Sequence, residues 1–254
     1  MIHYFNVFKL KHLFVTICKI AFFLLLLFSG ERTYAQNSRI AIINLVDSNL
    51  IYKHIGFKMF KDNADRFDCK FNCNEYIDKE LTRLLSTRYT VSLISIPGSL
   101  IYPNGSIYNS FDIKKEINSW ISGIKDQYDY VIFVESGEQD DLMDSKKQKL
   151  QSSGLYSRGN PLNSWVAVYT TARFSLIRTS NLENLDYDWG GMDYILQFNE
   201  YQFSRDAVLI DPEMLQLIRT QLIKLFDYKL EYFLTNSYLI SGDEYTRLKI
   251  LKVD

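Results

Sequence analysis

The sequence predicts an α/β fold: a mixed, partly parallel sheet with flanking helices and an antiparallel C-terminal part. Short, almost continuously apolar runs at 39–46 and 130–134 are typical of strands buried on both faces. Helical patterns alternate with these runs, which favours parallel strands joined by crossovers. A long alternating run at 165–177 and a strong helix start at 211–213 follow them.

The first elements are two strands and a helix. The strand at 39–46 is followed by a weaker strand at 53–60 and by a charged loop at 61–73. Asn74 is expected to cap the next helix, which ends near residue 87. The apolar residues of this helix share one face: Ile77, Leu81, Leu84 and Leu85.

The middle of the chain repeats this order. A strand at 89–96 ends at a Pro-Gly break, and a long loop leads to a helix opened by Asp112. The stripe of this helix consists of Ile113, Ile117, Trp120, Ile121 and Ile124. After the buried strand at 130–134 the chain becomes polar, and we expect a loop at 136–153.

The last third has a different pattern. Because the run at 165–177 alternates over its whole length, it predicts an antiparallel strand, paired with 154–157 or with 192–198. Asp211-Pro212 then starts a helix that runs to about residue 235. Its many charged side chains exclude a membrane-spanning helix.

Residues 1–35 are predicted to be an export signal. A basic stretch ending at Lys19, an apolar run at 20–28 and a small residue at Ala35 follow the order of a signal peptide. The alternative is an uncleaved N-terminal membrane anchor, although a spanning helix needs about 20 apolar residues. Either way, we expect 36–254 to form a single α/β domain outside the cytoplasm: periplasmic, secreted, or anchored to the inner membrane and facing the periplasm.

Cleavage at this position changes the composition of the chain. The 254 residues carry 29 basic and 30 acidic side chains, and the 219 residues after Ala35 carry 25 and 29. With 47% hydrophobic and 23% charged residues, the chain is neither disordered nor collagen-like. Because the mature part is mildly acidic, we expect no nucleic-acid partner.

Histidine is scarce, and this limits the available chemistry. Only His54 follows the signal, beside a predicted strand, where a structural role is expected. Catalytic triads and histidine-based zinc or iron sites lack the residues that they need. No phosphate-binding loop, dinucleotide fingerprint or nucleophile elbow occurs, so we predict no cofactor, no metal and, on balance, no enzyme activity.

Carboxylates leave one catalytic alternative open. Glu135 follows the strand at 130–134 at the carboxyl end of a predicted central strand, which is where open α/β sheets bind ligands. Asp140 follows on the polar loop, so a carboxylate-dependent periplasmic hydrolase centred on these two residues is conceivable. A solvated acidic loop after a strand explains the same residues without catalysis.

Aromatic residues make up 15% of the chain and concentrate in the antiparallel region. An exposed row there would offer a flat surface to a glycan or a protein. The candidates for such a surface are Tyr156, Trp165, Tyr169 and Trp189. Packing within the sheet explains most of them more simply.

Cys69 and Cys73 are the two cysteines that follow the signal. In an oxidising compartment, so close a pair is expected to form a disulfide worth about 2 kcal/mol. Free thiols are the alternative, and a zinc site would need two more ligands.

Several segments together resemble a group of uncharacterised secreted bacterial proteins. They are the strand at 39–46, the Gly-Phe-Lys-Met-Phe segment at 56–60, the strands at 89–96 and 130–134, the Gly-Leu-Tyr signature at 154–156 and the run at 165–177. The order of elements is also distantly similar to the α/β domain of envelope lipoproteins such as the curli secretion channel and the penicillin-binding-protein activators. That likeness implies a non-catalytic binding or assembly role in the cell envelope, with an envelope protein or a glycan as partner. Unlike those proteins, this chain has no convincing lipidation cysteine.

Overall fold

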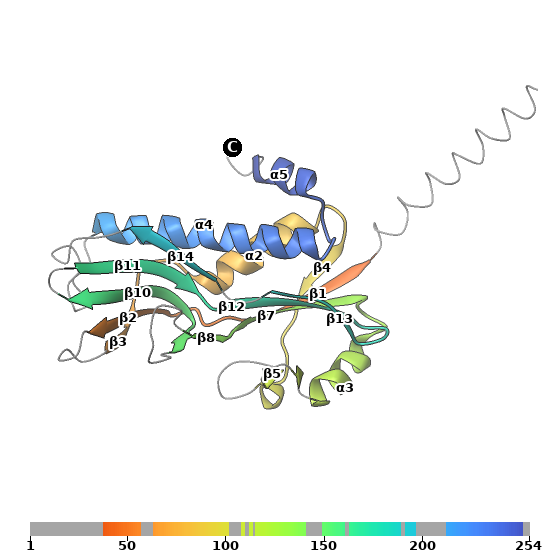
Figure 1. Cartoon of the computed structure of the whole chain (residues 1–254). Coiled ribbons are helices and arrows are strands. Elements are labelled where there is room, and N and C mark those ends of the chain that lie inside the picture. Colours follow the sequence, from red (N-terminus) through yellow and green to blue (C-terminus); the bar gives the residue numbers. More distant parts are fainter. Residues whose placement is uncertain are drawn as a thin grey trace, which may run out of the picture.

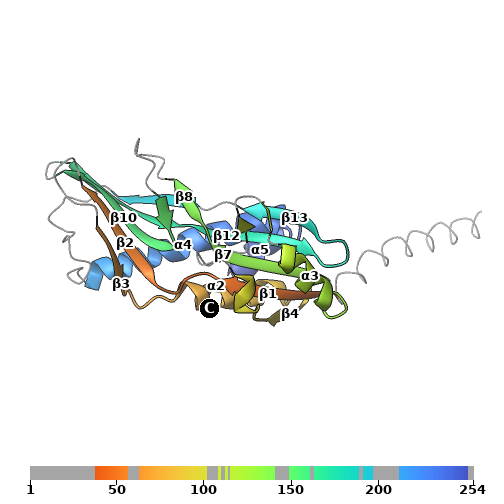
Figure 2. The same ribbon diagram turned by 90° about the horizontal axis from the view of Figure 1, so that it is seen from below.

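Two five-stranded sheets, which we call sheet A and sheet B, lie end to end along the molecule (Figures 1 and 2). The computed structural model describes residues 38–56, 63–101, 108–109, 112–113, 115–140, 149–160, 163–188, 191–196 and 212–250. The predicted export signal at 1–35 lies outside these residues. Helices cover both sheets.

Sheet A has the strand order β13-β12-β7-β1-β4. Strands β4, β1 and β7 run parallel, and β12 and β13 extend the sheet beyond β7 in antiparallel fashion. The predicted fold class, a mixed and partly parallel α/β sheet, is therefore confirmed. The strands are β1 (Arg39–Leu45), β4 (Thr90–Leu93), β7 (Tyr130–Ser136), β12 (Ala172–Arg178) and β13 (Glu183–Asp188).

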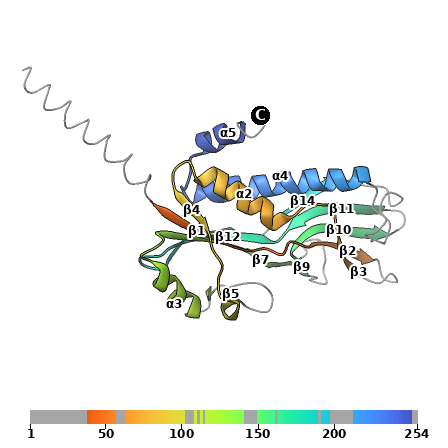
Figure 3. The same ribbon diagram turned by 180° about the vertical axis from the view of Figure 1, so that it is seen from behind.

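Helices α2 and α3 cover opposite faces of sheet A (Figure 3). Ile40 and Ile42 of β1 pack with α2, and Ala41 and Ile43 pack with α3, because successive side chains of a strand point to opposite faces. Burial on both faces explains why β1 is apolar throughout. The helices are α2 (Cys73–Leu85), η1 (Gly98–Leu100), α3 (Lys115–Ile124), α4 (Pro212–Asn236) and α5 (Gly242–Ile250).

Sheet B has the strand order β14-β11-β10-β2-β3, and the sequence patterns did not predict it as a separate sheet. Strands β2 and β10 pair in parallel, and the other neighbours are antiparallel. The strands are β2 (Leu50–Gly56), β3 (Asn63–Phe67), β10 (Ser153–Asn160), β11 (Asn163–Thr170) and β14 (Gly191–Leu196).

The alternating run at 165–177 is divided between the two sheets. Strand β11 ends at Thr170 in sheet B and β12 begins at Ala172 in sheet A. The intervening Thr171 donates its backbone N–H to the carbonyl of Ser152 at 2.8 Å. The prediction of one continuous strand is therefore wrong, but both expected partners lie beside β11, which pairs with β10 and with β14.

The segment at 136–153, expected as a polar loop, contains a small hairpin. Strands β8 (Glu138–Asp140) and β9 (Lys149–Gln151) pair in antiparallel fashion, and β10 begins at Ser153. Strands this short and polar carry no apolar periodicity, so the sequence pattern does not reveal them.

Helix α3 starts later than predicted. Asp112–Ile113 form strand β6, which pairs with β5 (Tyr108–Asn109), so Asp112 does not open the helix. The helix begins two residues after β6 and buries Ile117 and Ile121, as its stripe predicts.

Helix α4 begins at Pro212, as predicted, and lies along sheet B beside α2 (Figure 1). The shorter helix α5 follows it and was not predicted. In the described part of the chain, no helix combines the length and the apolar character that crossing a membrane requires. The apolar face of α4 buries Ile218, Leu222, Leu225, Phe226, Leu230, Phe233 and Leu234.

Candidate functional site

The carboxyl ends of β1 and β7 form a switch point in sheet A. Strand β4, reached through α2, lies on one side of β1, and β7, reached through α3, lies on the other. Open α/β sheets bind ligands in the crevice at such a point. Glu135 lies here, near the end of β7, as the sequence predicts.

Hydrogen bonds link the connections that leave the carboxyl ends of these strands. Gly137 donates its N–H to the carbonyl of Thr171 at 3.0 Å, and Thr171 donates its own to Ser152. The hydroxyl of Ser152 in turn donates to the carbonyl of Asn49 at 3.1 Å. These bonds join the connections that lead from sheet A into sheet B, so the strand ends of sheet A continue directly into the second sheet.

Glu135 is enclosed between strands. Its residue surface is 1% exposed, and its register partner across the antiparallel pair of β7 and β12 is Arg173. Directly opposite residues of such a pair project from the same face. A methyl group added at Gly137 would lie 2.0 Å from Nε of Arg173, so the guanidinium occupies the room that this glycine leaves. The geometry therefore sets a cation beside the buried carboxylate.

Asp140, the second residue of the predicted acid site, lies in β8 opposite Lys149. Its side chain lies outside the described part of the structure. A joint site formed by Glu135 and Asp140 therefore stays a prediction.

The other face of the same strand ends carries an amide and carboxyl cluster that links β1 to α2. Asn44 donates Nδ2 to the carbonyl of Asn74 at 3.0 Å and to Oδ1 of Asp78 at 2.9 Å. Burial raises the pKa of Asp78 above its usual value, although the hydrogen bond from Asn44 partly offsets the rise. Asn74 is thus part of this link, and the residue that caps α2 is Asn72, whose side chain accepts from the N–H of Glu75.

The predicted aromatic surface is wrong for two of its four residues. Tyr156 and Tyr169 are 0% and 1% exposed and pack against each other beside Leu150. Burial raises the pKa of Tyr169, whose hydroxyl donates to the carbonyl of Gln151 at 3.0 Å. The alternation of β10 and β11 therefore serves packing. The side chain of Trp165 in β11, and all of Trp189, lie outside the described residues.

The exposed aromatic side chains of the described structure lie elsewhere, on α4 and just after it. Tyr228 and Tyr232 are one helical turn apart and are 66% and 50% exposed, and Tyr238 is 90% exposed. Sequence reasoning did not single them out. The usable signal is that Tyr228 and Tyr232 fall outside the apolar stripe of the helix.

Cys69 and Cys73 are free thiols in the structure, which differs from the predicted disulfide. Both are buried in the core beneath α2, and Cys73 is the first residue of that helix. Burial raises the pKa of Cys69 to about 11 and that of Cys73 to about 12, and the nearby Cys69 contributes to the second shift. Thiols this hard to ionise are poor nucleophiles.

We expect the folded mature chain to resist thiol alkylation at pH 8, because burial raises the pKa of both thiols well above the usual value of a cysteine and keeps them protonated. Unfolding without reductant should release two reactive thiols, counted by mass spectrometry after maleimide labelling. Labelling that appears only after reduction would show the disulfide instead.

The same shifts in thiol pKa make the stability of the fold decrease as pH rises above about 9, since the unfolded thiols then ionise and the folded ones do not.

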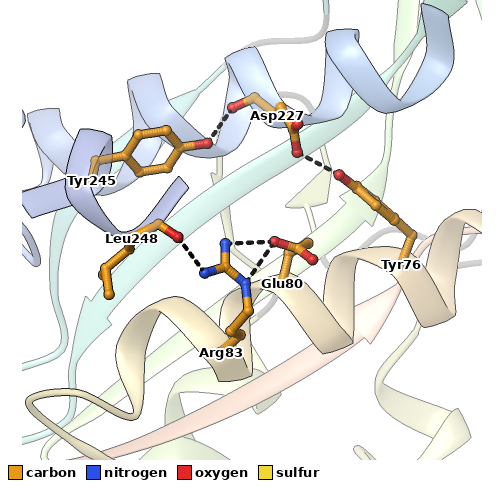
Figure 4. Close-up of polar contacts among 6 residues, drawn as sticks. All are labelled: Tyr76, Glu80, Arg83, Asp227, Tyr245 and Leu248. Atoms are coloured by element: carbon orange, nitrogen blue, oxygen red, sulfur yellow. Dashed lines mark hydrogen bonds and ion pairs between the residues drawn. The ribbon is translucent and has the colours of Figure 1, made fainter. Parts of the chain in front are cut away.

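A polar network joins α2, α4 and α5 (Figure 4). The hydroxyl of Tyr76 donates to a carboxylate oxygen of Asp227, and that of Tyr245 donates to the Asp227 carbonyl at 2.8 Å. Burial first, and then Asp227, raise the pKa of both tyrosines. Arg83 contacts Glu80 at 2.8 Å and donates to the carbonyl of Leu248 at 2.9 Å, so α5 is held to α2. These hydrogen bonds and the ion pair hold the three helices together, which is a structural role.

Metal-binding side chains do not gather in the described regions, where no group of three or more His, Cys, Asp and Glu residues could hold an ion. The backbone of His54 lies in β2, opposite Ser157 of β10 and Asn63 of β3. Its side chain is outside the described part.

No family model and no curated protein matches the chain. A solved structure from Xanthomonas campestris, assigned to the family DUF330, is 6% identical and has a TM-score of 0.32, covering 78% of this chain and 87% of its own. A neuraminyllactose-binding hemagglutinin homolog from Helicobacter pylori is 10% identical with a TM-score of 0.30, covering 86% and 95%. Overlaps this loose carry no argument about fold or function. The distant likeness to the curli secretion channel and the penicillin-binding-protein activators gains no support from them.

Proposed function

We propose that the protein is a non-catalytic binding or assembly factor of the cell envelope, exported by residues 1–35. The signal pattern, the scarcity of histidine and the resemblance to secreted bacterial proteins support this proposal. Its partner is an envelope protein or a glycan.

The surroundings of Glu135 are the observation that favours a non-catalytic role over a carboxylate-dependent hydrolase. A general acid or base must come within hydrogen-bond reach of its substrate, and the two carboxylates of a glycosidase flank the bond that breaks. Glu135 is instead 1% exposed, lies between strands and has Arg173 on its face. A carboxylate in this position faces the interior of the sheet and not a substrate.

Cell fractionation and a complementation assay test the proposal together. The mature chain should begin at Gln36, as N-terminal mass spectrometry would establish, and should be recovered from the periplasm or the medium. Asp140→Asn, alone and combined with Glu135→Gln, should leave the envelope phenotype of a deletion strain fully complemented wherever the variants fold. Recovery from the cytoplasm, or a folded variant that loses a hydrolytic activity of the purified wild type, would contradict the proposal.

A further inference from the structure

Tyr238 occupies a backbone conformation that favours glycine. Its φ is 57°, in the left-handed region. The N–H of Leu239 bonds to the carbonyl of Leu234 at 3.1 Å, and the N–H of Tyr238 bonds to that of Thr235 at 3.2 Å. This pair of bonds is a Schellman motif with Tyr238 at the position after the cap, where glycine is the usual residue. A tyrosine here costs folding free energy.

Other left-handed residues of the described chain gain a contact in return. Leu182 packs against the core under α3, and Ser152 donates its hydroxyl to a backbone carbonyl. The backbone N–H of Lys70 donates a hydrogen bond to the side chain of Asp68. The ring of Tyr238 is 90% exposed, so packing does not offset its cost. A residue that weakens the fold without a local gain is a mark of function.

The chain around Tyr238 is held rigidly. Leu239 and Ile240, which follow it, are buried, and the hydroxyl of Tyr89 donates to the carbonyl of Leu239 at 3.1 Å. Arg88 forms an ion pair with Glu244 at the start of α5. The turn therefore presents the ring from a fixed base, which lowers the entropy that a binding partner would have to remove.

We propose that Tyr238 is the anchor through which this chain binds a protein partner that has an apolar pocket with a rim of mixed charge. A ring this exposed, on a turn, can be enclosed by a concave surface, and binding hot spots are enriched in tyrosines set in such pockets. A sugar would instead stack on a ring that lies level with its surroundings. Helix α5, which follows the turn, exposes Asp243, Arg247 and Lys249, so a partner surface that carries charges of both signs would complement it.

The first test is stability, measured as the melting temperature of the purified mature chain. Tyr238→Gly should raise the Tm by about 2–4 °C, because it relieves the left-handed strain. Tyr228→Gly is the matched control: that tyrosine is 66% exposed inside α4, where glycine should lower the Tm. A lower Tm for Tyr238→Gly would overturn the premise of strain.

The second test is photo-crosslinking in living cells, with benzoylphenylalanine placed at the exposed Asn236 of the full chain. We expect a protease-sensitive crosslinked band that Tyr238→Gly reduces about tenfold or more. Tyr238→Phe should keep the ring and most of the band, and Tyr228→Gly should leave it unchanged. A band indifferent to Tyr238, the absence of a band, or a band removed by muramidase would overturn the proposal.

This inference rests on the proposed function, and the two can fail separately. A chain recovered from the envelope that crosslinks from other positions, but not through Tyr238, would remove only the anchor. A chain recovered from the cytoplasm would remove the envelope role as well.

Discussion

Replacing Gly154 by alanine is expected to destabilise the protein by about 3 kcal/mol or more. A Cβ at this position would lie 2.0 Å from the carbonyl oxygen of Ile51 and 2.7 Å from its nitrogen. Both atoms are backbone of β2, the parallel neighbour of β10, so the strands would have to separate. The φ of 154° adds strain for any side chain. Urea unfolding of the purified mature chain would measure the loss.

Gly123→Ala is the matched control for this prediction. Gly123 lies in α3, where an added Cβ would meet no atom within 4 Å. Alanine there should stabilise the protein by about 0.5–1 kcal/mol, since it reduces the entropy of the unfolded chain and favours helix. Equal effects at the two glycines would contradict the close approach of β2 and β10.

The parallel part of sheet A was predictable because its pattern is local. Strand β1 and strand β7 are buried on both faces and therefore read as short apolar runs. Sheet B depends on the pairing of β2 with β10, which are about a hundred residues apart, and β2 contains Lys53 and His54. No local periodicity signals such a pairing, and so the second sheet was missed as a separate sheet although the partners of β11 were predicted.

The candidate site shows the same division. The place of Glu135 follows from its position at the end of an apolar run, and the prediction of that place is confirmed. Its partner Arg173 follows from the register of β12, which depends on the break at Thr171 between the two sheets. Likewise, the spacing of residues shows that Tyr228 is off the apolar face of α4, whereas the conformation of Tyr238 depends on how the helix ends.

Arg173→Met is expected to cost about 3 kcal/mol, because it leaves the carboxylate of Glu135 buried without the cation on its face. Methionine keeps much of the volume of the side chain, so the loss reports charge more than packing. Combining it with Glu135→Leu should recover most of that stability, since an apolar pair requires no ion to be taken out of water. Both values come from urea unfolding at neutral pH.

Arg178→Met provides the control on the same strand. Arg178 forms its ion pair with Glu183 at 2.7 Å, but the two side chains are 40% and 49% exposed. Water screens such a pair, so its loss should cost less than about 1 kcal/mol. If Arg173→Met were equally mild, the Glu135 carboxylate would have to be satisfied without Arg173, and the compensation of its charge by Arg173 would be wrong. A large loss at Arg173 with recovery in the double variant would show that Arg173 compensates the buried charge of Glu135, so that the acid at the switch point is engaged inside the sheet and does not face a substrate.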